Sequence, residues 1–196
     1  MKVGTKSILF GAHAFWLHGF FVARAWTHLY GFPYDPRLWF AFFLHDLGYF
    51  NKPNMDGAEG ETHTEFGAKI MHWLFDNHYH INNEDDIQHP TYFWYDFCLY
   101  HSRYYSKKYN KPVSKLCYAD KLSFVYTPKW LYIPMAKASS EIYEYLDHSK
   151  YAESEHWKPT GDDINLWYDQ LKIYIKNWVI EHIDGNEDTW TKERKI

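Results

Sequence analysis

The segment Leu38-Trp-Phe-Ala-Phe-Phe-Leu44-His45-Asp46-Leu47-Gly48-Tyr49 decides the fold, because an apolar run leads directly into two metal-binding side chains. The apolar part of this segment favours burial. A buried carboxylate is costly unless another group compensates its charge. A divalent metal would compensate Asp46, and the rest of the chain supplies the partners that such a metal needs.

The composition indicates a compact folded protein without a general surface for nucleic acid. The 196 residues are 46% hydrophobic and most simply form a single domain, residues 1–196. The net charge of −4 offers no general basic surface for a nucleic acid. Two cysteines without metal-finger spacing, and an amino-terminal segment without a cleavage site, predict a cytoplasmic, reduced protein.

The long apolar stretch from Ile8 to Gly31 raises the question of a membrane span. His13, His18, Arg24 and His28 interrupt it, and charged side chains are expensive inside a bilayer. We therefore expect no membrane partner.

The hydrophobic periodicity predicts an all-α protein, since no alternation favours a sheet. Asp35 before Pro36, Thr62 with Glu65, and Asp162 or Asp163 are typical helix starts. The expected helices cover about 7–30, 36–47, 63–77, 90–107, 114–126, 135–146 and 163–183. The motif-bearing core spans about 13–126, and the carboxy-terminal helices about 134–183.

Several polar side chains lie on the apolar faces of these helices. His18 shares a face with Ala14, Val22 and Ala25, and Asp120 lies between Leu116 and Phe124. His101 follows Phe97 and Cys98 on a common face. Taken alone, His18 is more simply a core histidine and His63 a surface histidine. A buried salt bridge would explain Asp120, but such pairs are weak stabilisers and a metal explains it more directly. His13 and His28 are rivals of His18 on the same helix.

Together these side chains favour a metal centre. Carboxylate and imidazole ligands suit Mn²⁺, Fe²⁺, Co²⁺, Ni²⁺ or Zn²⁺, and Mg²⁺ also accepts the carboxylates. Three histidines and two carboxylates leave open positions on such an ion. A metal with open positions lowers the pKa of bound water and polarises an electrophile, which metal-assisted hydrolysis requires.

The order of these motifs resembles the HD superfamily of metal-dependent phosphohydrolases. Residues 18–23, His-Gly-Phe-Phe-Val-Ala, are similar to that family's first-histidine helix, and Leu44 to Gly48 resembles its naming His-Asp doublet. Residues 63–68 resemble its intermediate motif, in which Gly-Ala follows the histidine. Residues 116–122 resemble its last-aspartate helix, Ala-Asp-Lys followed by an apolar residue.

The resemblance implies a helical bundle with the metal centre in its core. It implies metal ligation by His18, His45, Asp46 and Asp120. In members with two ions, the equivalents of His63 and His101 bind the second, and Asp46 bridges; in members with one, they contact phosphate or act as acid and base. A catalytic glutamate often follows the doublet by one turn, but Tyr49 and Phe50 stand in that region here, which puts a 5′-monophosphatase mechanism in doubt.

Basic and aromatic side chains near the expected ligands support a phosphorylated substrate. Arg103 and Lys121 are candidates to hold transferring phosphoryl groups, while Lys107 is either such a group or a solvated helix end. Tyr49 and Tyr104 are candidates to stack on a nucleobase. With His63 and His101 these residues form the predicted catalytic and substrate-binding set.

The resemblance implies a nucleotide phosphohydrolase, and first a dATPase-like deoxynucleoside triphosphate triphosphohydrolase. A dinucleoside polyphosphate hydrolase or a cyclic-nucleotide phosphodiesterase is an alternative within the same class. The ligand pattern also fits a di-iron oxygenase of this family, and a further alternative is an inactive nucleotide-binding module. The many aromatic residues favour a homo-oligomer.

Overall fold

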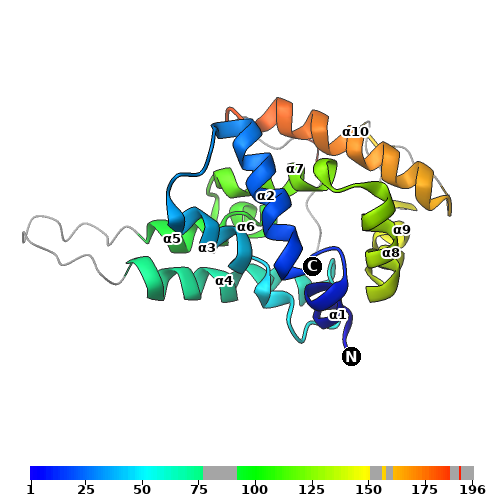
Figure 1. The fold of residues 1–196 in the computed structure, drawn as a ribbon, viewed down its shortest axis with the longest axis horizontal. Coiled ribbons are helices and arrows are strands. Elements are labelled where there is room, and N and C mark those ends of the chain that lie inside the picture. Colours follow the sequence, from blue (N-terminus) through cyan, green and yellow to red (C-terminus); the bar gives the residue numbers. More distant parts are fainter. Residues whose placement is uncertain (77–91, 151–155, 158–160, 186–189, 191–196) are drawn as a thin grey trace, which may run out of the picture.

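The computed structural model describes residues 1–76, 92–150, 156–157, 161–185 and 190, and no β-strand occurs among them (Figure 1). The all-α prediction is therefore confirmed. The expected start of a helix at Pro90 lies outside the described residues. The α-helices are α1 Val3–Phe10, α2 Phe15–Tyr30, α3 Pro36–Leu44, α4 Thr64–Met71, α5 Phe93–Leu99, α6 Arg103–Tyr109, α7 Lys115–Tyr126, α8 Lys129–Ser139, α9 Glu141–Lys150 and α10 Ile164–His182. The shorter 3₁₀ turns are η1 Leu47–Tyr49 and η2 Gly60–His63, and a π-turn, η3, spans His72–Asp76.

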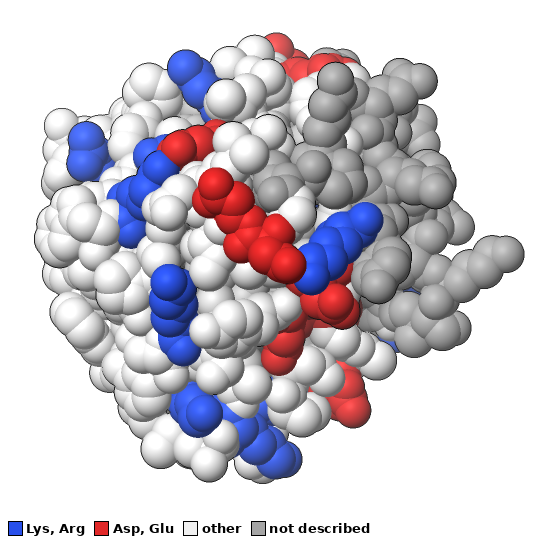
Figure 2. Space-filling model, turned by 90° about the vertical axis from the view of Figure 1, so that its right-hand side faces the viewer, with Lys and Arg blue, Asp and Glu red and all other residues white. Residues whose placement is uncertain are grey.

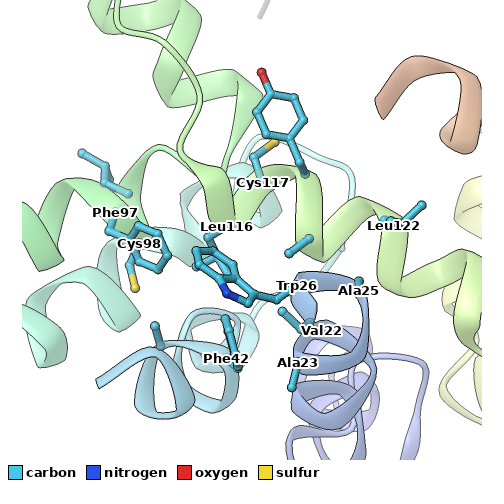
Figure 3. Packing of buried hydrophobic residues seen from close by; sticks show 14 of the residues in the cluster. Val22, Ala23, Ala25, Trp26, Phe42, Phe97, Cys98, Leu116, Cys117 and Leu122 are labelled. Carbon is cyan, nitrogen blue, oxygen red and sulfur yellow. The ribbon is translucent and has the colours of Figure 1, made fainter. Parts of the chain in front are cut away.

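The main core lies where α2 packs on α7, with α3, α5 and α10 around them. Trp26 on α2 occupies its centre, with its ring 5.6 Å from that of Phe42 on α3 and 5.9 Å from that of Phe97 on α5 (Figure 3). Leu116 on α7 closes the same cluster and is fully buried. These apolar contacts fix the helices that carry the predicted metal ligands.

Two glycines allow close approaches, Gly48 between η1 and η2 and Gly67 between α4 and the end of α3. A β-carbon at Gly48 would lie 1.8 Å from the carbonyl oxygen of His63, and one at Gly67 would lie 2.6 Å from that of Leu44. No side chain fits at those distances. The glycines of the His-Asp-Leu-Gly and His-Thr-Glu-Phe-Gly motifs thus bring His63 next to the doublet.

The predicted first helix, 7–30, is wrong as a single element. The chain forms α1 and α2, which are bent by 69° at a break between them. At this break the backbone N–H of Ala12 donates to Glu141 Oε1 at 2.6 Å, instead of to a carbonyl one turn earlier. A buried side chain from α9 therefore stabilises the bend.

The predicted helices 90–107 and 135–146 are also interrupted. A break at residues 100–102 separates α5 from α6, and His101 lies in that break. Pro134 lies inside α8 rather than before a helix, and the chain turns instead at Ser140, whose φ of 73° is left-handed. The second and third predicted helices end earlier than expected, at Leu44 and Met71, and continue as a 3₁₀ turn and a π-turn.

The helix caps agree with the sequence in part. Asp35 accepts a hydrogen bond from the N–H of Arg37, and Asp163 accepts from those of Asn165 and Leu166, as predicted. The predicted capping box is wrong. Thr62 instead donates to the carbonyl of Glu59 and accepts from Lys52, and Glu65 accepts from the hydroxyl of Tyr105.

Helices α8 and α9 lie at the opposite end of the molecule from α5 (Figure 1). Acidic and basic side chains are interspersed over the described part of that end, without an extended basic patch in this view (Figure 2). Among the described helices none is by itself long and apolar enough to cross a bilayer; α1 and α2 meet the length and composition only as a bent pair.

Candidate metal centre

Six predicted side chains from five segments of the chain meet in the core. The six residues are His18 on α2, His45 and Asp46 after α3, His63 at the end of η2, His101 between α5 and α6, and Asp120 on α7. All are buried, with at most 9% of their surface exposed. They form two groups, His18, His45, Asp46 and Asp120 in the first and Asp46, His63 and His101 in the second, and in each group the ligand atoms lie within 4.8 Å of one another.

Asp46 belongs to both groups. Its Oδ2 lies 3.4 Å from His18 Nε2 and 3.3 Å from His45 Nε2, while its Oδ1 lies 3.3 Å from His63 Nε2 and 3.4 Å from His101 Nε2. Asp120 closes the first group, with Oδ1 3.0 Å from His18 Nε2. The two oxygens of one carboxylate therefore face two neighbouring positions, as a bridging ligand does.

Backbone carbonyls orient three of the imidazoles. His45 Nδ1 lies 3.1 Å from the carbonyl oxygens of Ala41 and Phe42, His63 Nδ1 lies 2.7 Å from that of Gly60, and His101 Nδ1 lies 2.5 Å from that of Cys98. Since a carbonyl only accepts, each Nδ1 donates its proton. Metal-bound histidines are usually held this way, with the other nitrogen turned to the ion.

The charges of Asp46, Asp120 and His63 match those of metal ligands, whereas the Asp46 carboxylate keeps His45 protonated at pH 7. Burial raises the pKa of the Asp46 and Asp120 carboxyls, but His45 and Lys121 respectively outweigh it and hold both well below the usual range. Burial lowers the pKa of His63 to about 4, so this ring is neutral at pH 7. Burial also lowers the pKa of His45, but the Asp46 carboxylate outweighs it and raises the pKa to about 10.

The donor set fits a divalent metal. His45 Nε2 and Asp46 Oδ2 are fully shielded from water, and neither makes a hydrogen bond of good geometry. Buried polar atoms without a partner are rare and call for an explanation. Carboxylate and imidazole ligands suit Mn²⁺, Fe²⁺, Co²⁺, Ni²⁺ and Zn²⁺, and an ion held by the first group would give these two atoms a partner.

A pocket of about 230 Å³ opens onto the first group, since His18 and Asp120 line it. Arg103 and Lys121 line the same pocket. Lys121 Nζ lies 3.1 Å from Asp120 Oδ2, and the Arg103 guanidinium lies 5.2 Å above the ring of Trp178, another wall residue. One cation therefore contacts a ligand of the first position, and a second lines the same pocket.

The second group lies behind Tyr49. The Tyr49 ring stacks on that of His63 at 3.9 Å and 9°, and Tyr49 lines the pocket while His63 and His101 do not. The structure thus brings Tyr49, Arg103 and Lys121 to the pocket. It places Tyr104 and Lys107, both also predicted to bind substrate, outside the pocket lining.

Sequence reasoning missed a second buried network beside the pocket. Glu141 Oε2 accepts from Ser7 Oγ at 2.6 Å and lies 3.1 Å from Nδ1 of His13, a pocket residue. Its Oε1 accepts from Ser139 Oγ at 2.6 Å. Glu141 is fully buried, but it lies at the start of the polar helix α9. No apolar helix face in the sequence therefore indicates that it is buried. The sequence offers His13 only as an alternative to His18 on the same predicted helix, and the high number of histidines is the one sequence feature that points to it.

Comparison with models of protein families, with curated proteins and with solved structures found no match to this chain.

Proposed function

We propose that this protein is a metal-dependent phosphohydrolase of the HD type that acts on nucleotides. The pocket carries the proposal, because it joins the His18–Asp120 side of the cluster to Arg103 and Lys121. A site for phosphoryl transfer needs cations beside a group that activates water, and these residues supply both. The order of the six ligands along the chain, which resembles the HD superfamily, is a second support.

His18, His45, Asp46 and Asp120 would hold the ion that faces the pocket. When bound, that ion would supply an acidified water and polarise a phosphoryl oxygen. His63 and His101 would hold a second ion or contact the phosphate themselves, with Asp46 shared between the two positions.

The chain's own cations act on the substrate. Arg103 can donate two parallel hydrogen bonds to one phosphate, and its contact with the Trp178 ring limits its rotation. Lys121 is oriented by Asp120, so its charge lies beside the reacting group. Charge that develops on phosphoryl oxygens during transfer is stabilised by cations already in place.

Within this class a deoxynucleoside triphosphate triphosphohydrolase is the specific activity we propose. A dinucleoside polyphosphate hydrolase would use the same cations. The aromatic wall of the pocket, with Tyr49, Tyr132 and Trp178, supports a nucleoside because aromatic faces stack on bases.

One observation favours a second class. Asp46 faces two adjacent positions, and four histidines direct Nε2 toward them, which also suits two irons that react with oxygen. In that case Arg103 and Lys121 would bind an anionic substrate that is oxidised rather than hydrolysed.

The test is a screen of nucleoside mono-, di- and triphosphates with metal-stripped protein reloaded with Mn²⁺, Co²⁺, Mg²⁺ or Fe²⁺. We expect metal-dependent release of triphosphate, pyrophosphate or phosphate, resolved by chromatography. If the iron-loaded protein consumes oxygen and releases no phosphate, the protein is an oxygenase rather than a hydrolase. No turnover of either kind would overturn the enzymatic proposal.

A further inference from the structure

The pocket has two ends of different chemistry. Arg103 and Lys121 lie close enough for the Arg103 charge to affect the pKa of the Lys121 ammonium. The Trp178 ring packs against the Arg103 guanidinium. Burial raises the pKa of Tyr49, Tyr132 and Tyr145, and the charge of the Asp56 carboxylate adds to this rise. Asp56 therefore lies near these three tyrosines, which line the same pocket. The pocket therefore carries its cations where α6 and α7 line it, and the Asp56 carboxylate where α9 lies beside it.

Helix α9 holds Asp56 in place. Asp56 Oδ2 lies 3.0 Å from His148 Nδ1, and the preceding N–H, of Met55, donates to Glu144 Oε2 at 2.8 Å. The Met55 side chain is buried, with 2% of its surface exposed. The backbone N–H and the side chain of Met55 therefore both hold the loop in place next to Asp56. Asn54 Oδ1 accepts from the N–H groups of Gly57 and Gly60, which closes the rest of the loop. The Asp56 carboxylate is thus a preorganised group.

A carboxylate at the end of a substrate pocket selects for hydrogen-bond donors. An ionised carboxylate accepts hydrogen bonds and donates none, so it favours an N–H group over a carbonyl or ether oxygen. Ligand pockets generally fix orientation through a small number of polar groups among apolar and aromatic walls. A site built to bind an N–H group rejects an analogue that lacks it.

We propose that Asp56 is a specificity residue, which accepts a hydrogen bond from an N–H group on the part of the substrate distant from its phosphoryl group. The assignment of the phosphoryl end to Arg103 and Lys121 rests on the proposed function. The substrate is therefore a phosphate ester with an amino group at its other end. Two kinds of molecule share this chemistry, a nucleotide whose base carries an exocyclic amine and a phosphorylated alkylamine.

Calorimetric binding to the intact chain tests the proposal with two matched pairs of ligands. Adenosine 5′-monophosphate and purine riboside 5′-monophosphate differ by the exocyclic amine, and 2-aminoethyl phosphate and ethyl phosphate differ by the alkylamine. In one pair we expect the amino compound to bind about tenfold more tightly, the range of a charge-assisted hydrogen bond. The pair that shows the preference identifies the source of the amine.

Asp56→Ala is expected to abolish this preference, and Asp56→Asn, which keeps the size but not the charge, to weaken it. Asp147→Asn is the control, since Asp147 is an exposed carboxylate of α9 that does not line the pocket. Equal binding within both pairs by the wild type would overturn the proposal, as would a preference that survives in both Asp56 variants. If the Asp56 variants lose the preference but the wild type hydrolyses no phosphate ester, the role of Asp56 in specificity is upheld and only the phosphohydrolase proposal is rejected.

Discussion

His63 Nε2 and His101 Nε2 lie 3.3 Å apart in the core, although each ring donates its Nδ1 proton to a backbone carbonyl. With that tautomer, the two nitrogens direct lone pairs toward each other. Two lone pairs at this distance repel unless a proton or a cation lies near both. The fold therefore holds these imidazoles ready for an ion, and Asp46 Oδ1, 3.3 to 3.4 Å from each, adds the negative charge.

Asp46→Ala is expected to bring the metal content of purified protein close to zero, because its carboxylate belongs to both ligand groups. The apolar core of α2, α3 and α7 stays intact, so circular dichroism should remain helical. Elemental analysis after dialysis measures the content, and Asp147→Asn is the matched control. Full metal occupancy in Asp46→Ala would reject the assigned centre.

His63→Ala is expected to remove one ion per chain from protein that binds two, and to leave the first position filled. The reason is that His63 belongs only to the group that Tyr49 covers, whereas His18 and Asp120 face the pocket. His18→Ala should instead deplete the first position. Titration of metal-stripped protein gives both stoichiometries, and identical losses in the two variants would contradict two separate positions.

Arg103→Ala is expected to weaken the binding of phosphate-bearing ligands by roughly 10- to 100-fold, the range for a lost charge-assisted hydrogen bond. Lys107→Ala is the control, because Lys107 lies one helical turn further along α6, is exposed and does not line the pocket. Dissociation constants for inorganic phosphate and a nucleotide provide the comparison. Equal effects of the two substitutions would remove Arg103 from the site.

Glu141→Gln is expected to lower the free energy of unfolding at pH 7 and to flatten its dependence on pH. Burial raises the pKa of Glu141, but its bonds from His13, Ser139 and Ser7 outweigh this and lower it. A carboxyl with a lowered pKa in the folded state stabilises the protein above its unfolded pKa, about 4.3, and loses that contribution as the pH falls.

Denaturant unfolding at pH 7, 5 and 3 measures this effect. The wild type should lose more stability than Glu141→Gln between pH 5 and pH 3. Although burial opposes it, Glu141 raises the pKa of His13, so His13 stays protonated in that interval and adds no slope. Glu141→Ala, which leaves the buried donors without their acceptor, should cost about 3 to 5 kcal/mol. Parallel pH curves for wild type and Glu141→Gln would refute this account.

The features that could be predicted from the sequence depend on residues that lie close together along the chain. The caps at Asp35 and Asp163, the apolar faces around His18 and Asp120, and the doublet at the end of α3 depend on residues within about four positions. The break at Ala12 could not be predicted this way, because its N–H is satisfied by Glu141, 129 residues away.

The sequence by itself determined an all-α chain and the six polar side chains that turn inward, since helix periodicity and motif order are local properties. Only the tertiary structure decided that Asp46 faces two positions, that Tyr49 covers one of them and that Arg103 shares a pocket with Trp178 and Asp56. Those relations depend on how helices distant in sequence pack together, and packing is set by the shapes of many side chains at once.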